Sequence, residues 1–500
     1  MAPQVDQQLH FIMFPLMAQG HMIPMVDMAR LFAQRGVNIT IVTTPLNTLR
    51  FKTVIDREIQ AGLPIRLLQL QFPTSEVGLP EGCENYDTLP SRDMVMKFFA
   101  AITMLQEPLE QAIKEMDPMP SCIVSDMLFP WTNDTANKFD IPRLIFHGVS
   151  CFSLLCSHNI HLHKAHENVT SESEPFVVPD LPDVIEVTKA CLPAEFNNSP
   201  PEMRDLRMKV RESEYTSYGV LLNSFDALEP KYVWDYQKVK GSKAWCIGPV
   251  SFCNKEDIDK AERGNKASID DHECLKWLDS KEQNSVVYVC LGSLCQFLPL
   301  QLIEIGLGLE ASNRPFVWVI RRGKNDSELE KWLSEERFVE RTKDRGLVIM
   351  GWAPQVLILE HQAIGGFLTH CGWNSALEGV CAGLPMITFP MFAEQFLNEK
   401  LIGQVLEIGV SVGIKTSIQW GEEEKIGVLV KREDVEIAVN KVMDEGERGE
   451  IRREKARELR KMARSAMEEG GSSHLNMTLF IQDIMHHARK KSVHSDKETI

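Results

Sequence analysis

The apolar positions in the first half of the chain switch repeatedly between short continuous runs and helical spacing. The run at residues 11–14 ends at Pro15, and residues 22–32 then carry apolar side chains at helical intervals, with Pro24 suited to the first turn of a helix. Further apolar or β-branched runs typical of strands lie at residues 37–42, 65–70, 122–125, 144–146 and 218–223, with a helical pattern over residues 94–115. Strands that alternate with helices predict a parallel sheet covered on both faces.

The second half begins the same pattern again at residues 286–291. Four more strands are predicted at residues 316–320, 347–350, 366–368 and 386–389, and helices at residues 298–311, 374–382 and 394–406. Two long helices close the chain, at about residues 432–467 with a break near Gly446 and at residues 473–489. We therefore predict an α/β protein with two doubly wound, Rossmann-like domains that face one another across a cleft.

The division between the two domains is predicted from a change in composition. Residues 253–272 are crowded with charge and poor in apolar side chains, which is typical of a linker. We assign residues 1–250 to the first domain, 251–272 to the linker, 273–470 to the second domain and 471–500 to a helix that packs back on the first. Ligands of open parallel sheets bind beyond the carboxyl ends of the strands.

Composition and net charge limit the classes of molecule that the protein is expected to bind. The chain has 500 residues and a formal net charge of −16, which argues against nucleic acid because phosphates would be repelled. An acidic protein can still bind a diphosphate at a helix N-terminus. The 12 cysteines show no C-x-x-C spacing, and no apolar run approaches the length of a membrane span. We expect a reduced, cytoplasmic protein without a membrane segment.

Two short motifs are set aside as weak. Asp257-Ile258-Asp259 resembles a metal-binding D-x-D motif, but it lies in the predicted linker rather than at a strand end, so no metal is expected. The glycines at 306 and 308 fit a dinucleotide-binding pattern that would favour a nicotinamide oxidoreductase. They fall inside a helical pattern, which favours close helix packing instead.

The segment from Trp352 to Gln395 carries the most specific chemistry. It contains a predicted strand, a turn at residues 369–373 and a helix that opens at Asn374, whose N-terminal N–H groups suit a diphosphate. His370 lies beside this turn, and Glu378, one helical turn on, could accept hydrogen bonds from two vicinal hydroxyls. Trp352 offers a flat face to a base.

This segment resembles, along its full length and without a gap, the plant secondary product glycosyltransferase signature of the family 1 UDP-glycosyltransferases. The rest of the chain also resembles that family. The resemblance implies a GT-B fold, inversion at the anomeric centre, UDP-glucose as the donor and no metal or other cofactor. Gln395 at the last signature position favours glucose over galactose.

The resemblance also implies roles for individual residues. Uracil would be bound by Trp352, Ala353 and Gln355, ribose by Glu378, the diphosphate by Ser293, His370, Asn374 and Ser375, and the sugar by Trp373, Glu394 and Gln395.

A hydroxyl acceptor needs a general base near pH 7, and histidine is the usual choice. His21 follows the first predicted strand in a loop that opens a helix, and Asp126 follows the strand at residues 122–125, so both lie at the same edge of one sheet. A carboxylate beside the histidine would stabilise its protonated form. The family has its base and partner in segments like those around His21 and Asp126.

The acceptor is the least defined part of the prediction. The chain looks most like the branch that glucosylates triterpenoids, steroids, cytokinins and flavonoids, and we favour a triterpenoid or steroid hydroxyl, with a flavonoid, another phenol or a cytokinin as the alternative. The acceptor pocket is expected to use residues 16–20, 73–94, 129 and 191–201. A non-catalytic UDP-sugar binding protein is the alternative from a different class, against which the intact His21 and Asp126 argue. A monomer is expected.

Overall fold

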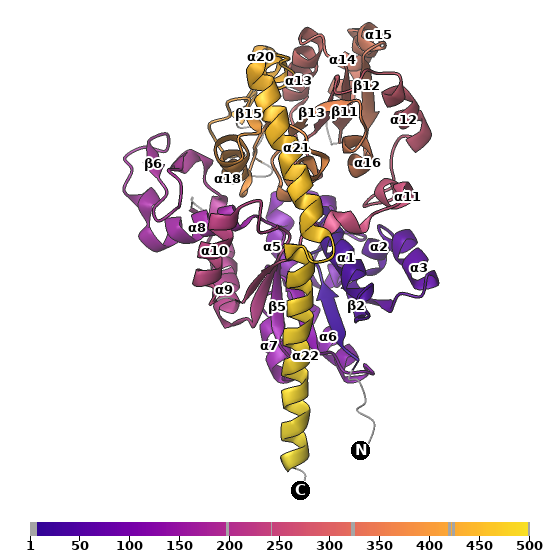
Figure 1. Cartoon of the computed structure of the whole chain (residues 1–500), viewed down its shortest axis with the longest axis vertical. Helices are drawn as coiled ribbons and strands as arrows, with labels where there is room; N and C mark the ends of the chain where they lie inside the picture. The colour runs from indigo at the N-terminus through magenta and orange to yellow at the C-terminus, as the bar shows by residue number, and fades with distance from the viewer. Residues whose placement is uncertain are drawn as a thin grey trace.

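The computed structural model describes residues 8–196, 200–241, 243–321, 326–418, 422 and 426–498. Two parallel sheets, each covered by helices, form two domains that meet end to end, with the first domain in indigo to magenta and the second in orange (Figure 1). The predicted α/β architecture with two doubly wound domains is therefore confirmed. Part of the predicted acceptor loop, residues 197–199, lies outside the described residues.

The first sheet has the strand order β3-β2-β1-β4-β5-β8-β9 and is parallel throughout. Its strands are β1 (His10–Phe14), β2 (Asn38–Thr43), β3 (Ile65–Gln69), β4 (Cys122–Asp126), β5 (Arg143–His147), β8 (Gly219–Leu222) and β9 (Ala244–Cys246). The order reverses direction at β1, where β1 pairs with β2 on one side and β4 on the other. The carboxyl ends of β1 and β4 therefore lie side by side, which is the usual place for a site in such sheets.

The helices of this domain cover both faces of the sheet. They are α1 (Gln19–Ala33), α2 (Pro45–Thr48), α3 (Lys52–Gln60), α4 (Thr74–Val77), α5 (Val95–Met104), α6 (Gln106–Lys114), α7 (Thr132–Lys138), α8 (Cys151–His163), α9 (Pro201–Thr216) and α10 (Pro230–Val239). A small antiparallel pair, β6 (Pro175–Val177) and β7 (Glu186–Thr188), lies outside the main sheet.

The second sheet has the order β12-β11-β10-β13-β14-β15 and is also parallel. Its strands are β10 (Val286–Cys290), β11 (Phe316–Ile320), β12 (Gly346–Met350), β13 (Ile364–Thr369), β14 (Met386–Thr388) and β15 (Gly409–Ser411). Its helices are α12 (Asp271–Asp279), α13 (Pro299–Ala311), α14 (Asp326–Glu335), α15 (Phe338–Thr342), α16 (Gln355–Leu359), α17 (Trp373–Ala382), α18 (Gln395–Lys400) and α20 (Arg432–Val442).

The glycines at 306 and 308 lie in the interior of α13, so the dinucleotide motif is not a phosphate loop. A Cβ atom on Gly308 would come within 2.6 Å of the Arg432 carbonyl oxygen, and one on Gly306 within 2.9 Å of the Trp318 ring. Both glycines therefore serve the close packing of α13 against α20 and the sheet, as the helical pattern predicted.

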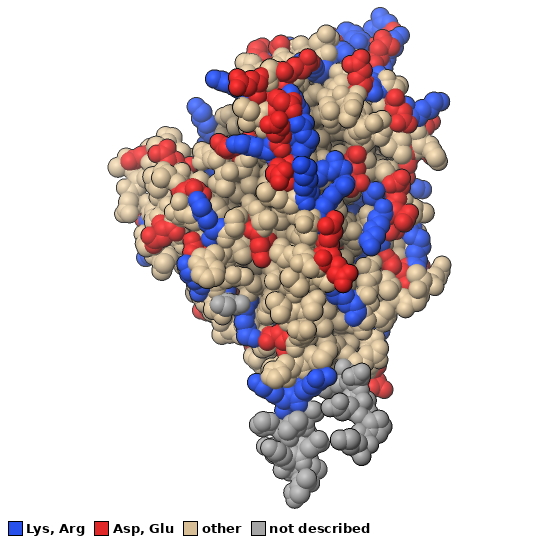
Figure 2. Space-filling model, in the orientation of Figure 1, with Lys and Arg blue, Asp and Glu red and all other residues tan. Residues whose placement is uncertain are grey.

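The two closing helices join the domains. α21 (Glu447–Met467) lies on the second domain, and α22 (Ser472–Glu498) runs down the first (Figure 1). Phe480 of α22 packs 5.5 Å from Phe11 of β1 and 5.4 Å from Phe32 of α1, measured between ring centroids. The surface of α21 carries acidic and basic side chains side by side (Figure 2). Among the described residues, every helix is too short or too polar to cross a membrane.

Several element boundaries differ from the predictions. Residues 94–115 form two helices rather than one, because Pro108 cannot donate to the carbonyl of Met104 and the chain breaks at Leu105. The helix predicted at residues 394–406 ends as a π-helix at Leu401–Val405. β9 and β15, which were not predicted, are three-residue strands at the edges of their sheets. The predicted break near Gly446 is present.

Candidate functional site

His21 and Asp126 meet at the edge of the first sheet. α1 begins at Gln19, so His21 lies in the first turn of the helix and not in the loop before it, where it was predicted. Asp126 is the last residue of β4. His21 Nδ1 donates to Asp126 Oδ2 at 2.7 Å, and the Leu128 backbone N–H donates to Asp126 Oδ1 at 3.0 Å. This pairing leaves Nε2 of His21 unprotonated in the neutral ring, with 30% of its side chain exposed to the cavity.

The electrostatics of the pair favour an ionised carboxylate and a basic imidazole. Burial by itself raises the pKa of Asp126, but the charge and hydrogen bond of His21 hold that pKa below its ordinary value. Burial by itself lowers the pKa of His21, but Asp126 raises that pKa above its ordinary value. The arrangement can therefore accept a proton at Nε2 and stabilise the resulting cation.

Pro24 leaves a backbone carbonyl of α1 without its usual donor within the helix. It lies in the second turn of α1 rather than the predicted first turn, and it cannot donate to the Gly20 carbonyl four residues back. That carbonyl instead accepts a hydrogen bond from Asn374 Nδ2 at 2.6 Å. The helix that carries His21 is thereby joined to the N-terminus of α17 in the second domain.

His370 follows β13 and lies between two glycines. A Cβ atom would lie 2.5 Å from His370 Nε2 if placed on Gly292, and 2.3 Å from it if placed on Gly372. Burial lowers the pKa of His370 to about 4, so its ring is neutral at physiological pH. Its buried Nδ1 has no hydrogen-bond partner among the described residues, which makes it available to a ligand.

Glu378 of α17 is the centre of a polar group on the floor of the cavity. Its Oε2 accepts from Gln355 Nε2 at 2.7 Å, and the same amide nitrogen donates to Ser375 Oγ at 3.1 Å. Its Oε1 is paired with Arg263 of the linker, a contact that the sequence did not suggest. Only 7% of the Glu378 side chain is exposed, so the carboxylate is held in one orientation.

The two tryptophans of the signature are fixed in different ways. Trp373 Nε1 donates to the Asn223 carbonyl at 2.7 Å, which ties α17 to the end of β8. The backbone of Trp352 is paired with Ser268, whose N–H donates to the Trp352 carbonyl at 2.8 Å. Ala353, directly after it, is buried and lines the cavity.

Glu394 and Gln395 lie at the start of α18, close to the His21–Asp126 pair. Gln395 Oε1 accepts from the backbone N–H groups of Met391 at 2.8 Å and Phe392 at 3.1 Å. Burial raises the pKa of Glu394, although the nearby His21 has the opposite effect on it. Residues from the two domains thus approach one another at this point.

One cavity of about 1240 Å³ connects all of these positions. Every predicted site residue lines it except Asp126, which is buried behind His21. Asp126 therefore contacts the site only through the histidine.

The wall that the first domain gives to the cavity differs in its details from the predicted acceptor pocket. Phe129 does not line it, because that side chain is buried in the core against Phe14 at 4.9 Å. Helix faces that were not predicted contribute much of the wall. They include Met96 of α5, Leu154, His158 and His161 of α8, Met203, Arg207 and Arg211 of α9, and Lys240 after α10. His161 contacts Arg211, and no group of three or more potential metal ligands was found among the described residues.

Models of protein families and the sequences of known proteins show the class to which this chain belongs. The family model described as UDP-glucoronosyl and UDP-glucosyl transferase matches residues 255–421, and the model of the glycosyltransferase N-terminal domain matches residues 7–252. The chain is 54% identical to UDP-glycosyltransferase 73C25 of Barbarea vulgaris, over 97% of this chain and 98% of that protein. It is also 54% identical to UDP-glycosyltransferase 73C5 of Arabidopsis thaliana, over 95% and 97%.

Solved structures agree with the sequence comparison. UGT73P12 of Glycyrrhiza uralensis, complexed with glycyrrhetinic acid 3-O-monoglucuronide, matches with a TM-score of 0.92 and 38% identity over 99% of each chain. UGT2 of Phytolacca americana, complexed with UDP-2fluoro-glucose and pterostilbene, matches with a TM-score of 0.74 and 25% identity over 95% of this chain and 99% of that one. The protein belongs to the plant UDP-glycosyltransferases and has their GT-B fold.

Proposed function

We propose that this UDP-glycosyltransferase moves glucose from UDP-glucose to a hydroxyl group of a triterpenoid or steroid, with inversion at the anomeric carbon. The observation that supports this proposal most is the His21–Asp126 pair, with its 2.7 Å hydrogen bond, opening on the cavity that the signature residues line. A pair of this kind activates a hydroxyl, which is the step that a transfer to an alcohol requires.

In the proposed reaction the donor is held by the second domain. Uracil lies on Trp352 and pairs with the backbone of Ala353 near Gln355, and Glu378 accepts from the ribose hydroxyls. The diphosphate contacts Ser293, His370, Asn374 and Ser375, and glucose contacts Trp373, Glu394 and Gln395. The N-terminus of α17 supplies the favourable potential in this acidic protein, so no metal is required.

The chemical step is a single displacement. His21 Nε2 removes the proton of the acceptor hydroxyl while its oxygen attacks C1 of the α-linked glucose from the face opposite UDP. The bond from C1 to the diphosphate oxygen breaks as the new C–O bond forms, which gives a β-glucoside, UDP and protonated His21. Asp126 stabilises that cation, and the α17 terminus and His370 stabilise the charge that develops on UDP.

The shape and chemistry of the acceptor side favour a large, mainly apolar molecule. Met96, Met127, Leu128, Val149 and Leu154 line it, and flexible thioethers adapt to fused-ring skeletons. The structural relative UGT73P12 was solved with a glycyrrhetinic acid conjugate, which is a triterpenoid derivative. A flavonoid, another phenol or a cytokinin is the alternative, and pterostilbene in the UGT2 complex illustrates a smaller phenolic ligand.

The proposal is tested by incubating the protein with UDP-glucose and a panel of hydroxylated triterpenoids, steroids, flavonoids and cytokinins, and by following the gain of one hexose by mass. We expect product with the triterpenoids or steroids, and a loss of about 10³-fold or more in kcat/KM for His21→Ala. UDP should raise the melting temperature of both proteins equally, because His21 does not hold the nucleotide.

Two outcomes would change the proposal. Efficient transfer only to phenols or cytokinins would replace the triterpenoid acceptor with the alternative. Stabilisation by UDP with no transfer to any member of the panel would favour a binding protein that lacks the reaction.

A further inference from the structure

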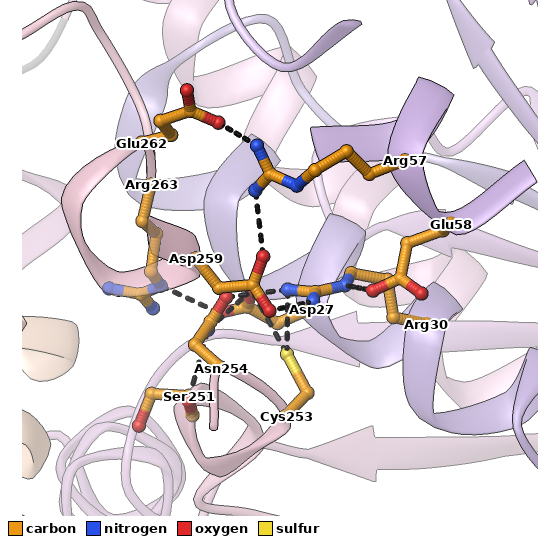
Figure 3. A network of polar contacts seen from close by, with 10 residues as sticks. All are labelled: Asp27, Arg30, Arg57, Glu58, Ser251, Cys253, Asn254, Asp259, Glu262 and Arg263. Atoms are coloured by element: carbon orange, nitrogen blue, oxygen red, sulfur yellow. Dashed lines mark hydrogen bonds and ion pairs between the residues drawn. The ribbon is translucent and has the colours of Figure 1, made fainter. Parts of the chain in front are cut away.

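The charged linker of residues 251–272 packs against both domains, and Lys260 within it pairs with Glu360 of the second domain at 3.0 Å. Its helix α11 (Asp257–Ala261) carries Asp259, which accepts from Arg30 Nη2 at 2.9 Å and from Arg57 Nη2 at 2.7 Å. Arg57 also pairs with Glu262. Figure 3 shows Arg57 reaching from α3 to both acidic side chains. The motif that resembled D-x-D is therefore an anchor of the linker on α1 and α3.

Arg263, directly after this anchor, connects the two domains through buried charges. Its Nε donates to Asp27 Oδ2 of α1 at 2.8 Å, and its Nη1 donates to Glu378 Oε1 of α17. Only 10% of the Arg263 side chain, 3% of Asp27 and 7% of Glu378 are exposed. Burial by itself lowers the pKa of Arg263, but the two carboxylates raise that pKa well above its ordinary value. One guanidinium thus neutralises a buried carboxylate from each domain.

The next linker residues cover Trp352. Gly264 has a φ of +93°, and a Cβ atom on it would lie 2.5 Å from Cζ2 of Trp352 and 2.9 Å from Ile23. The Trp352 backbone N–H donates to Ser268 Oγ at 3.0 Å. Arg263, Asn265 and Lys266 line the same cavity as the signature residues. The linker backbone therefore lies against the indole that is assigned to uracil.

We propose that linker residues 263–268 form a wall of the nucleotide pocket and that Arg263 is a positioning residue for the donor, holding the Glu378 carboxylate correctly turned for the two ribose hydroxyls. This inference rests on the proposed role of Glu378. With Oε1 fixed by Arg263 and Oε2 by Gln355, the remaining lone pairs of Glu378 have defined directions. Without Arg263 the buried carboxylate keeps one amide partner, and its Oε1 loses the contact that fixes its direction.

The same contact couples donor binding to the catalytic helix. Asp27 lies on α1, which also carries His21 in its first turn. Asn374 forms a second bridge between α17 and α1 through the Gly20 carbonyl. The ribose carboxylate and the catalytic base are therefore held in one frame by two polar bridges across the cavity.

The test compares Arg263→Gln and Arg263→Lys with Arg57→Gln, in the full-length protein. Arg57 anchors the linker from outside the cavity, so its variant reports loss of docking alone. Kd is measured for UDP and for 2′-deoxy-UDP, together with kcat, both KM values and the melting temperature. We expect Arg263→Gln to weaken UDP binding and raise the KM for UDP-glucose about tenfold. The acceptor KM and kcat should change much less, because the Asn374 bridge still joins α17 to α1. Arg263→Lys should restore part of the loss.

The decisive measurement is the ratio of the affinities for UDP and 2′-deoxy-UDP, because a purely structural role of Arg263 would leave this ratio unchanged. The parent protein should bind UDP about tenfold more tightly than 2′-deoxy-UDP, and Arg263→Gln should bring this ratio close to one while Arg57→Gln leaves it unchanged. Unchanged or tighter UDP binding by Arg263→Gln would overturn the inference, because Arg263 would then be a competitor of ribose. Equal weakening by both variants would overturn it too. A Glu378→Gln variant tests the ribose contact separately from the role of Arg263. If this variant binds UDP normally, the proposed contact between Glu378 and ribose is itself wrong.

Discussion

The proposed donor side and the proposed acceptor side of the cavity are built on different principles. The donor side comes mostly from one continuous stretch, Trp352 to Gln395, whose members bond to one another, as Gln355 does to Ser375 and Glu378. The acceptor side comes from α5, α8, α9 and the segment after α10, which are far apart in the sequence.

This difference reflects what each side has to recognise. A nucleotide diphosphate is bound by backbone N–H groups and strand ends, and these positions are set by the sheet itself. An acceptor wall on helix faces and loops can change its side chains without altering the sheet. Mutations should therefore affect one substrate at a time, except at the residues where the two sides meet.

The largest effect in this series is expected at Asp126, which acts through His21 close to Glu394 of the second domain. The Asp126→Asn variant keeps the shape but removes the charge that stabilises protonated His21, and it allows the wrong imidazole tautomer. We expect kcat to fall about 10²- to 10⁴-fold with little change in either KM. Steady-state kinetics with both substrates varied measure this.

The pH profile sharpens this prediction. Asp126 raises the pKa of His21 above its ordinary value of 6.5, and the protonated base is inactive, so the parent rate falls as the pH drops through that raised pKa. Removing the charge lowers the pKa of His21, and the acid limb should move to lower pH. Asp134→Asn, on the exposed first turn of α7, is the charge-matched control. An acid limb that stays in place would contradict the assignment of His21 as the base.

A smaller effect confined to the donor is expected for Gly372→Ala. Gly372 has an ordinary φ of −58°, so the change acts through space: the new methyl group would lie 2.3 Å from His370 Nε2. Moving His370 or the turn should raise the KM for UDP-glucose about tenfold. Gly403→Ala is the matched control, since nothing lies within 4 Å of its Cβ position. Acceptor affinity, measured without donor, should be the same in all three proteins.

The sequence brought the residues of the proposed donor side together because they follow strand ends, which share one edge of a parallel sheet. Apolar runs located β1, β4, β10 and β13, and the polar residues just after them could then be assigned to one edge. The same reasoning brought His21 and Asp126 together. Helix faces could not be oriented in this way, so the side chains of α8 and α9 that line the cavity were missed.

Arg263 was missed for another physical reason. A charged, apolar-poor segment is typical of a solvated linker, and its contacts depend on tertiary structure. Arg263 lies 236 positions from Asp27 and 115 from Glu378, so no local pattern connects them. Long-range ion pairs of buried groups are visible only when the fold is known.

The smallest effect on the kinetic constants is expected for Met96→Ala. This variant also tests most directly whether the proposed donor and acceptor sides act independently. Met96 lines the proposed acceptor side from α5, and its truncation deletes contacts with an apolar skeleton while leaving every signature residue in place. We expect the acceptor KM to rise about three- to tenfold for a triterpenoid and less for a small phenol, with the KM for UDP-glucose unchanged. Met104→Ala on the same helix is the control, because Met104 is 46% exposed and lies outside the cavity. A parallel rise in the KM for both substrates would mean that the two sides are coupled through α5, and the comparison between an independent donor side and acceptor side would fail.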